Sequence, residues 1–420
     1  MRLRHIVGFV AFALAIVTPA TAIGAVRYAA PNGNGPQPCA QGDPCALRDA
    51  VEDAGGGDEV VVGIGNYTLG APLTVGPGVV VRGPSRPPRP LIVSTALDGV
   101  VVSGNATLRD LDIEHDGDGA ALRMRGGLAE RVTAHTTGGD QFAGACEPTA
   151  GTLRDSVCWR TGTGAAVRAE CNGNCSGDVE VRNVTAVAAQ GVGAIVAASG
   201  GAHLRLIVRN SILNGTSGGN SFDVQQNGGW PDSRADMILR YSNFYGGISS
   251  GPGILSGFGG GANQTAEPAF VDAANGNFHQ RANSSTIDAG GPDPLLGALD
   301  IDGQLRTQDG AADIGADEFP DSTPPQTGIT GAPKRKLKTA KRRKRVAFGF
   351  ESNEPGSSFE CKLDGDDEFA SCESPFKARV KAGGGKGRKH RFQVRAVDAV
   401  GNVDGTPSKK TLRVKRKPGR

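Results

Sequence analysis

The sequence predicts an all-β protein: a right-handed parallel β-helix, which is a solenoid of stacked strands, with an N-terminal capping helix and a small β-sandwich after it. Three observations lead to this prediction. A six-residue frame recurs six times, Gly and Pro number 64 and 25 of 420 residues while aromatic residues make up only 5 %, and the charge changes sharply near residue 320. Stacked short strands need small and β-branched interior residues and frequent turns, so this composition suits a solenoid.

The first 25 residues are expected to be a secretory signal peptide rather than part of the fold. Basic Arg2 and Arg4 precede the uncharged apolar residues 6–17, and residues 20–22 supply a small-x-small cleavage pattern. No second apolar stretch follows, so we expect no membrane span in the mature chain. The protein is therefore predicted to be secreted, either free outside the cell or associated with its surface.

Eight cysteines are expected to form disulfides, because export places them in an oxidising compartment. A zinc site at the third pair would need further ligands that its neighbourhood lacks, so no metal site is predicted there. Proximity along the chain favours four pairs, although the middle four cysteines could exchange partners. The pairs are Cys39 with Cys45, Cys146 with Cys158, Cys171 with Cys175, and Cys361 with Cys372.

A single helix is predicted between Asp43 and Gly55. Asp43 suits the N-cap, Pro44 the first helical position, and Gly55 the position just past the end. Apolar residues at helical spacing between them form one face. This helix lies where a solenoid needs an N-terminal cap over its first sheet edge.

The repeat begins with an apolar residue, continues with polar residues, and returns to an apolar or small residue at its sixth position. Its starts are 21, 24, 28, 27 and 31 residues apart, which suits one turn of a three-sided solenoid with loops of varying length. The first and last positions are predicted to point inward. The third is predicted to turn a corner in a left-handed backbone conformation, which Asn and Asp tolerate well. The six segments are residues 108–113, 129–134, 153–158, 181–186, 208–213 and 239–244.

Two side-chain columns follow from this frame. The corner positions Asp110, Asp155, Asn183 and Asn210 are expected to form a polar ladder. The second position carries an outward arginine in five of the six segments. Adjacent guanidinium groups repel, so the column is either a salt-bridged exposed face or a groove for an acidic glycan. The five are Arg109, Arg154, Arg182, Arg209 and Arg240, and a substitution such as Arg182→Ser is expected to be tolerated.

Residues 46–51 and 65–69 look like the start of secreted parallel β-helix proteins. Residues 267–272 and 285–290, then 300–306 leading to 312–319, resemble the choice-of-anchor Q family. Together the two likenesses cover residues 26–319. The resemblance implies a β-helix, export and surface association, and it implies no particular reaction.

The C-terminal part is predicted to be a separate, strongly basic domain. Residues 321–420 carry 25 basic residues against 11 acidic ones, whereas the first 320 carry 21 arginines, no lysine and 32 acidic residues. Residues 320–333 are predicted to be a Pro-rich linker and 334–420 a small sandwich. Residues 358–365, 390–398 and 401–404 resemble the Ig-like modules of exported bacterial proteins, which implies a spacer or attachment role.

No catalytic signature is found in the sequence. The best acidic cluster, Asp112, Glu114, Asp116, Asp118 and His135, is a weak candidate for catalysis and reads equally as a solvated loop. No cofactor is predicted; Ca²⁺ is the ion that the second acidic group would suit. The resemblance assigns that group a fold role instead. Its members are Asp300, Asp302, Asp309, Asp313 and Asp317.

The functional hypothesis is a non-catalytic exported protein that presents a β-helix face to a polysaccharide and attaches to an anionic cell-wall polymer through its basic tail. The alternative is a polysaccharide lyase or glycoside hydrolase on the β-helix. Nucleic acid is not expected as a partner, because the basic run lacks interleaved aromatic residues. Neither the glycan nor an oligomeric state follows from the sequence. The run comprises Lys334, Arg335, Lys336, Lys338, Lys341, Arg342, Arg343, Lys344 and Arg345.

Overall fold

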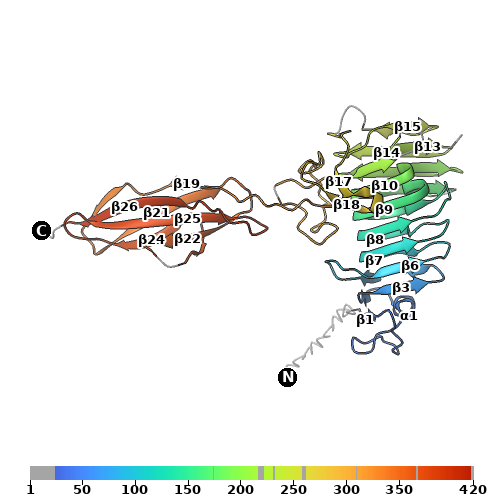
Figure 1. The fold of residues 1–420 in the computed structure, drawn as a ribbon, viewed down its shortest axis with the longest axis horizontal. Helices are drawn as coiled ribbons and strands as arrows, with labels where there is room; N and C mark the ends of the chain where they lie inside the picture. Colours follow the sequence, from blue (N-terminus) through green and yellow to red (C-terminus); the bar gives the residue numbers. More distant parts are fainter. Residues whose placement is uncertain are drawn as a thin grey trace, which may run out of the picture.

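The computed structural model describes residues 24–173, 175–215, 222–229, 232–257, 262–308, 310–365 and 368–417. A long stack of parallel strands forms the body, and a smaller β-sandwich lies at its side, reached through the segment after the last coil (Figure 1). The predicted signal peptide falls almost entirely outside the described residues, as does Asp309. Within the described residues, no helix is long and apolar enough to cross a membrane.

The body is a right-handed parallel β-helix, as the sequence predicts. Its strands form one 16-stranded sheet in which every pairing is parallel, and the longest strands bend around the corners of their coils. The elements are β1 Val26–Ala29, α1 Leu47–Glu52, β2 Glu59–Val62, β3 Asn66–Leu69, β4 Leu73–Val75, β5 Val80–Arg82, β6 Leu91–Ser94, β7 Val100–His115, β8 Leu122–Thr136, β9 Gly144–Asn172, β10 Ser176–Ser199, β11 His203–Arg209, β12 Ile212–Gly215, β13 Val224–Gly228, β14 Arg234–Arg240, β15 Gly247–Ser250 and β16 Leu255–Ser256.

The helix α1 starts later than the sequence pattern predicts. Its N-cap is Ala46, and no side chain caps it. Asp43 is not the N-cap, because the chain before the helix completes the first rung of the sheet: Cys45 pairs with Ala29 in a parallel bridge. The helix packs against β1, β2 and β4 at the N-terminal end of the stack, where a cap was expected.

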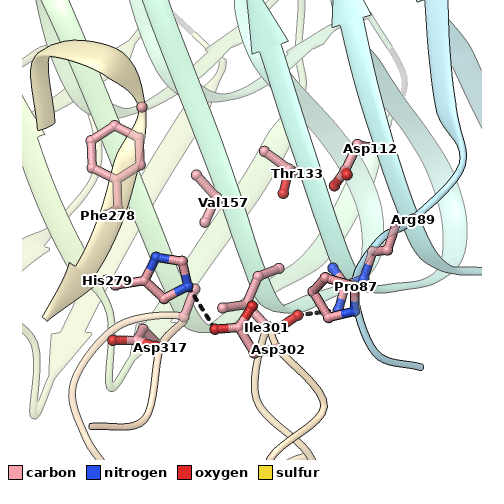
Figure 2. A pocket seen from close by; sticks show the side chains of 12 residues that line it. Pro87, Arg89, Asp112, Thr133, Val157, Phe278, His279, Ile301, Asp302 and Asp317 are labelled. Carbon is pink, nitrogen blue, oxygen red and sulfur yellow. Dashed lines mark hydrogen bonds and ion pairs between the residues drawn. The ribbon is translucent and has the colours of Figure 1, made fainter. Parts of the chain in front are cut away.

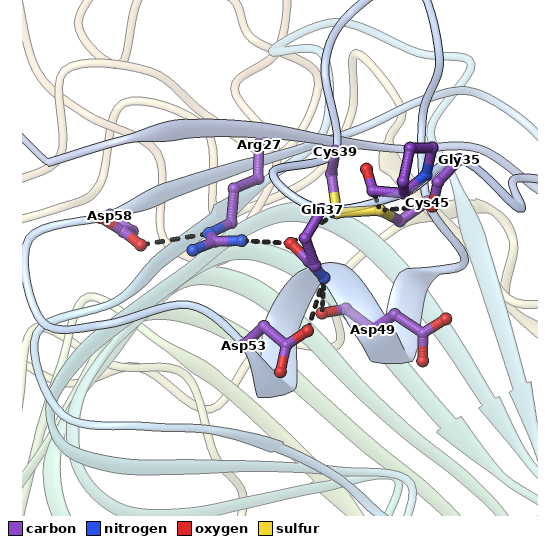
Figure 3. Close-up of a disulfide and its surroundings, with 9 residues drawn as sticks. Arg27, Gly35, Gln37, Cys39, Cys45, Asp49, Asp53 and Asp58 are labelled. Atoms are coloured by element: carbon purple, nitrogen blue, oxygen red, sulfur yellow. Dashed lines mark hydrogen bonds and ion pairs between the residues drawn. A yellow bond between two sulfur atoms is a disulfide. The ribbon is translucent and has the colours of Figure 1, made fainter.

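A disulfide and a polar network fix this N-terminal end (Figure 3). Cys39 and Cys45 are bonded and almost fully buried. Arg27 of β1 donates from Nε to Asp58 at 3.1 Å and from Nη1 to Gln37 at 2.6 Å, and Gln37 donates in turn to Asp53, the C-cap residue of α1. These contacts tie the outermost strand to the helix that covers it.

All six corner residues adopt the predicted left-handed conformation. Their φ values lie between +50° and +62°, even where the residue is neither Asn nor Asp. The two large side chains at corners have partners there: Arg131 donates from Nε to Asp110 at 2.7 Å, and the Tyr241 ring lies against the Arg209 guanidinium. The six residues are Asp110, Arg131, Asp155, Asn183, Asn210 and Tyr241.

The inward column of the repeat is also confirmed. Its first-position residues lie opposite one another from coil to coil, and each is at most 1 % exposed. Each fully buried Leu or Val stabilises the fold by about 1.5–3 kcal/mol relative to an exposed one. The column is Leu108, Ala129, Leu153, Val181, Val208 and Leu239.

After the last coil, residues 267–319 fold back along the side of the body; we call them the closing segment. They contain the hairpin of β17 Phe270–Asp272 and β18 Asn277–Gln280, with the short 3₁₀ helix η1 Ala273–Asn275 between them. Their contacts run along the corner column: the Arg89 guanidinium donates to Ile301, and Asn210 exchanges hydrogen bonds with Gly291. The segment therefore covers one long edge of the solenoid.

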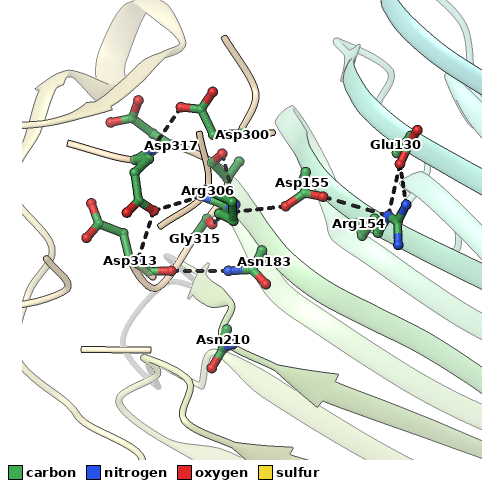
Figure 4. A network of polar contacts seen from close by, with 12 residues as sticks. Glu130, Arg154, Asp155, Asn183, Asn210, Asp300, Arg306, Asp313, Gly315 and Asp317 are labelled. Carbon is green, nitrogen blue, oxygen red and sulfur yellow. Dashed lines mark hydrogen bonds and ion pairs between the residues drawn. The ribbon is translucent and has the colours of Figure 1, made fainter. Parts of the chain in front are cut away.

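A buried polar network joins the closing segment to the corner ladder (Figure 4). Arg306, 1 % exposed, donates from Nε to Asp155 at 3.0 Å and lies 3.5 Å from the Glu318 carboxylate. Asn183 donates to the carbonyl of Asp313 at 3.1 Å. The polar ladder predicted at the corner thus serves as the docking strip for the closing segment.

The tail is a separate β-sandwich of two sheets. One sheet has the order β19-β21-β24 and the other β20-β26-β25-β22-β23, packed around Phe348, Phe350 and Phe392. The strand β19 lies within the predicted linker and pairs with β21, so the sandwich begins before residue 334. Its strands are β19 Thr327–Gly331, β20 Lys336–Thr339, β21 Arg343–Ser352, β22 Ser358–Leu363, β23 Ala370–Cys372, β24 Phe376–Lys381, β25 Arg388–Val397 and β26 Ser408–Arg416.

All four predicted disulfides are present, including the two pairs in the middle of the chain, and none of the eight cysteines is free. Such pairing is consistent with an oxidising environment outside the cytosol.

Candidate functional site

The outward arginine column exists, and it contains one more member, Arg82, than the frame predicts. Arg154, Arg182, Arg209 and Arg240 are register partners of one another, and Glu130 is the column member between Arg109 and Arg154. Several of the guanidinium groups are nevertheless neutralised by carboxylates. Glu59 contacts Arg82, and Glu130 lies 2.6 Å from the Arg154 guanidinium. Arg182 is only 7 % exposed and binds Asp293 of the closing segment. Of the two interpretations left open by the sequence, this pattern favours the salt-bridged face.

Two further arginines of the column differ in their surroundings. Arg209 donates to the carbonyl of Pro292 at 2.9 Å and lies over the ring of Tyr241. Arg240, at the last coil of the column, is exposed. The closing segment thus occupies much of the strip that an acidic glycan would need.

A pocket lies between the closing segment and the strands that follow the corner (Figure 2). Its coil side is formed by Asp112, Thr133 and Val157, which are register partners on three successive strands. Each lies two residues after a corner, so the left-handed turn fixes where it points. The closing segment and Arg89 form the other side. The closing-segment residues in the lining include His279, Asp302 and Asp317.

Charges of both signs meet in this pocket. The His279 Nε2 atom lies 2.6 Å from the Asp302 carboxylate, and this hydrogen bond raises the pKa of His279 to about 9. Burial raises the pKa of Asp317 to about 6. Burial also raises the pKa of Asp112, and the nearby Arg89 guanidinium acts in the opposite direction. At neutral pH the pocket therefore combines cationic donors with carboxylate acceptors.

The pocket volume is about 160 Å³. Pockets for drug-sized ligands usually measure about 300–1,000 Å³. The pocket thus has room for a single small polar group or ring, not for an extended chain. His279, Asp302 and Asp317 lie close enough together to share a metal ion, but the His279–Asp302 hydrogen bond already satisfies two of these groups.

A cluster of aromatic rings packs beneath the β17–β18 hairpin, which carries His279, and holds the hairpin against the coils. The His135 ring stacks on Trp159 at 3.9 Å between centroids, and Trp159 packs edge-on against Phe278. A side chain at Gly276 would collide with the Trp159 ring, because the ideal Cβ position lies 2.3 Å from it. His135, a weak catalytic candidate in the sequence, is thus part of the packing under the hairpin.

The other acidic candidates diverge. Glu114 is exposed beside His135 in the register, Asp116 accepts a hydrogen bond from Thr137 at 2.6 Å, and Asp118 is exposed outside the pocket lining. Only Asp112 of this cluster lines the pocket. Sequence reasoning missed Trp159, although Glu114, His135 and Trp159 all directly follow the sixth position of the frame.

The second acidic group is held by main-chain donors. Asp300 accepts hydrogen bonds from the backbone N–H groups of Gln304 and Glu318, and Asp313 accepts them from Asp288 and Phe319. Burial raises the pKa of Asp313 to about 6. These carboxylates shape the loops of the closing segment, while Asp302 and Asp317 of the same group reach the pocket.

The nine residues of the basic run lie at one end of the sandwich. They span β20, the following turn and the start of β21, at the end remote from the linker, because Thr327 next to the linker pairs with Ser352 at the opposite end of β21. Figure 1 shows this end, beside the C-terminus, pointing away from the body. A hollow there is lined by Lys341, Arg342, Arg343, Lys344, Arg345 and Arg379.

Like charges lie directly opposite one another on both sheets of the sandwich. In the first sheet Arg343 pairs with Lys381, and Arg345 with Arg379. In the second sheet Lys336, Arg413 and Lys389 form a row across three strands, and Lys338 pairs with Lys415. All of these residues are exposed. Within the described part of the sandwich, the ion pairs are His390–Asp364 and Arg395–Glu360, and neither includes a basic residue of these rows.

No family model matches the chain, and no curated protein matches it. The crystal structure of pectate lyase Pel9A is similar to it, with 14 % sequence identity and a TM-score of 0.31, over 71 % of this chain and 97 % of that chain. The fold assignment rests on the strand register described above.

Proposed function

We propose that the sandwich attaches this exported protein to an anionic polymer at a cell surface, and that the β-helix presents its pocket to a carbohydrate. The like-charge rows of the sandwich carry this proposal. Like charges directly opposite on neighbouring strands destabilise a sheet. Their repetition on both sheets, without interleaved carboxylates among the described residues, suits a surface that binds an anion outside the protein.

The binding is expected to be electrostatic rather than pocket-specific. Lysine and arginine on a rigid, exposed face attract phosphate or carboxylate polymers without a shaped cavity. The four disulfides are consistent with export, which would bring the sandwich to such polymers. The choice-of-anchor Q resemblance belongs to the same proposal, since it implies an anchor after the closing segment.

The test compares two double variants of the full chain on heparin beads, used as the anionic polymer. Arg345→Ser with Arg379→Ser should lower the salt concentration at which the protein elutes, between roughly 0.05 and 0.5 M, because exposed charges are screened by salt. Arg205→Ser with Arg234→Ser removes the same charge from exposed sites on the body and serves as the matched control. Equal effects of the two variants would refute attachment through the sandwich.

The carbohydrate part of the proposal rests on the pocket. The Arg89 guanidinium and the carboxyl groups of Asp112 and Asp317 suit the hydroxyl groups of one neutral sugar unit better than a carboxylate, while His279 and Asp302 shape the pocket through their mutual hydrogen bond. Binding of neutral and acidic oligosaccharides to the full chain, measured by calorimetry with Asp112→Asn as the variant, tests this. A preference for acidic oligosaccharides that Asp112→Asn leaves unchanged would contradict it.

Catalysis is the second candidate, favoured by one observation: Asp112 is a carboxyl with a raised pKa inside a pocket that holds further carboxylates. Its products would be new reducing ends for hydrolysis or unsaturated ends for elimination. Incubation with a panel of polysaccharides distinguishes an enzyme from a binding protein. Product formation that Asp112→Asn abolishes would support an enzyme. The absence of product with every polysaccharide would support a binding protein.

A further inference from the structure

A group of three carboxylates lies where the linker meets the sandwich. Asp321 lies two residues after the end of the closing segment, Glu354 lies in the turn after β21, and Asp398 follows β25. One carboxylate oxygen from each lies within 4.8 Å of the others. The three residues come from chain segments far apart in sequence, so the folded junction assembles them.

Two of these carboxylates are buried and only half satisfied. Asp321 is 9 % exposed and Asp398 is 8 % exposed. The Oδ1 atom of Asp321 accepts the Thr323 N–H at 2.7 Å, and Oδ1 of Asp398 accepts backbone N–H groups of the turn that follows it. Among the residues that the structure describes, the buried Oδ2 atom of each has no hydrogen-bond partner. An uncompensated buried carboxylate is costly, so both atoms point to a missing cation.

The surrounding charge is negative as well. Burial, then Asp321 and Asp398, raises the pKa of Glu354. Asp288 of the closing segment is close enough to Asp321 that its pKa is also raised, after the larger effect of burial. In the described residues around the group, no Lys, Arg or His forms an ion pair with any of its three members.

We propose that Asp321, Glu354 and Asp398 bind one Ca²⁺ ion that locks the linker onto the sandwich. All three ligands are carboxylate oxygens, which bind hard cations such as Ca²⁺ and Mg²⁺. Zinc and copper prefer sites that include nitrogen or sulfur ligands. Oxygens bound to one Ca²⁺ at 2.3–2.6 Å lie at most about 5.2 Å apart, which the 4.8 Å limit meets. Ca²⁺ tolerates irregular coordination completed by water, whereas Mg²⁺ demands a near-octahedral arrangement.

The consequence is mechanical. Asp321 belongs to the chain that leaves the body, and its carbonyl already accepts a hydrogen bond from Asn402 of the sandwich at 3.1 Å. A cation shared with Glu354 and Asp398 would add a second, charge-dependent tie at the same place. The junction would then be fixed in the presence of extracellular calcium and looser without it.

Calorimetric titration of the full chain with CaCl₂, after chelator treatment, tests the proposal. We expect one site with a dissociation constant of about 10⁻⁴–10⁻³ M, as in extracellular modules. Asp398→Asn should weaken binding at least tenfold, because it keeps the Oδ1 acceptor for the turn and replaces Oδ2 with an amide. Glu351→Gln, an exposed glutamate on β21 outside the group, is the matched control and should bind like the unchanged chain.

Thermal unfolding gives a second readout. Without Ca²⁺, Asp398→Asn should unfold at the same or a higher temperature than the unchanged chain, since it relieves carboxylate repulsion. With 10 mM Ca²⁺ the unchanged chain should gain about 5 °C and the variant should not. Unaltered calcium binding by Asp398→Asn, binding lost instead in Asp302→Asn of the pocket, or no binding at 10 mM would each overturn the assignment.

Discussion

Arginine is used in opposite ways in the two parts of the molecule. In the body, arginines of the outward column also lie opposite one another, but they form ion pairs with Glu59, Glu130 and Asp293, and the closing segment covers part of the column. In the described part of the sandwich, exposed basic residues face one another across the strands, and no carboxylate forms an ion pair with them.

The comparison distinguishes two uses of charge. In the body, paired arginines hold the fold together, whereas in the sandwich we propose that unpaired cations bind a partner. A neutralised guanidinium that is 7 % exposed, such as that of Arg182, cannot be removed without stranding its carboxylate. An exposed cation opposite another cation destabilises the sheet, and by our proposal it is available to a partner. The same residue type in regular strands therefore has a structural role in one domain and, by our proposal, a binding role in the other.

The largest expected effect comes from removing the buried cation of the closing segment. Arg306→Leu leaves Asp155 and Glu318 without their guanidinium, and breaking such a buried pair costs about 3–5 kcal/mol. Urea unfolding of the full chain measures this. Arg306→Lys, which keeps the charge, should cost less. Equal stability of Arg306→Leu and the unchanged protein would show that the closing segment is not held by this network.

The next prediction corrects an expectation from the sequence. The repeat marks Arg182 as outward and therefore tolerant, yet its partner Asp293 has a side chain that is fully buried. We expect Arg182→Ser to cost about 3 kcal/mol. The same change at the exposed Arg240 of the same column should stay within about 0.5 kcal/mol. Similar thermal midpoints for the two variants would mean that the closing segment does not protect this strip.

This case shows which part of the molecule the sequence predicts well. The corner conformation, the inward column and the disulfides follow from local rules: a left-handed turn favours Asn and Asp, a register repeats from coil to coil, and cysteines near in sequence pair. The closing segment follows no repeat. No periodic pattern in the sequence therefore predicts that it lies over Arg182, or that it brings His279 to a pocket beside Arg89. Like-charge pairing in the sandwich was also hidden, because a run of basic residues does not reveal which strands lie opposite.

Reversing one charge of the sandwich should separate stability from binding. Arg379→Glu turns the Arg345–Arg379 pair into an opposite-charge pair, which stabilises a sheet by about 0.2–1 kcal/mol. The same change should weaken retention on heparin and reduce its salt dependence. A variant that loses stability and keeps its retention would place the attachment surface elsewhere.

The smallest predicted effect is a loss of stability of the closing segment as the pH rises. His279 has its pKa raised to about 9 by Asp302, so its contribution is complete below the ordinary value near 6.5 and is lost as the pH rises through 9. Burial raises the pKa of Asp317 to about 6 and that of Glu318 to about 9. Each of these acids holds a proton in the folded state that the unfolded chain would release, so folding also becomes less favourable as the pH rises.

The three groups act in the same direction, Asp317 mainly below pH 6 and His279 and Glu318 up to about pH 9, and the half-exposed His279 pair contributes at most about 1 kcal/mol because solvent screens it. We therefore expect a lower thermal midpoint at pH 9 than at pH 6, followed by circular dichroism in buffers of equal ionic strength. His279→Asn should reduce this difference, and His203→Asn, on the exposed surface of the body, should not. A midpoint that rises from pH 6 to pH 9 would show that these side chains do not govern how the closing segment is held.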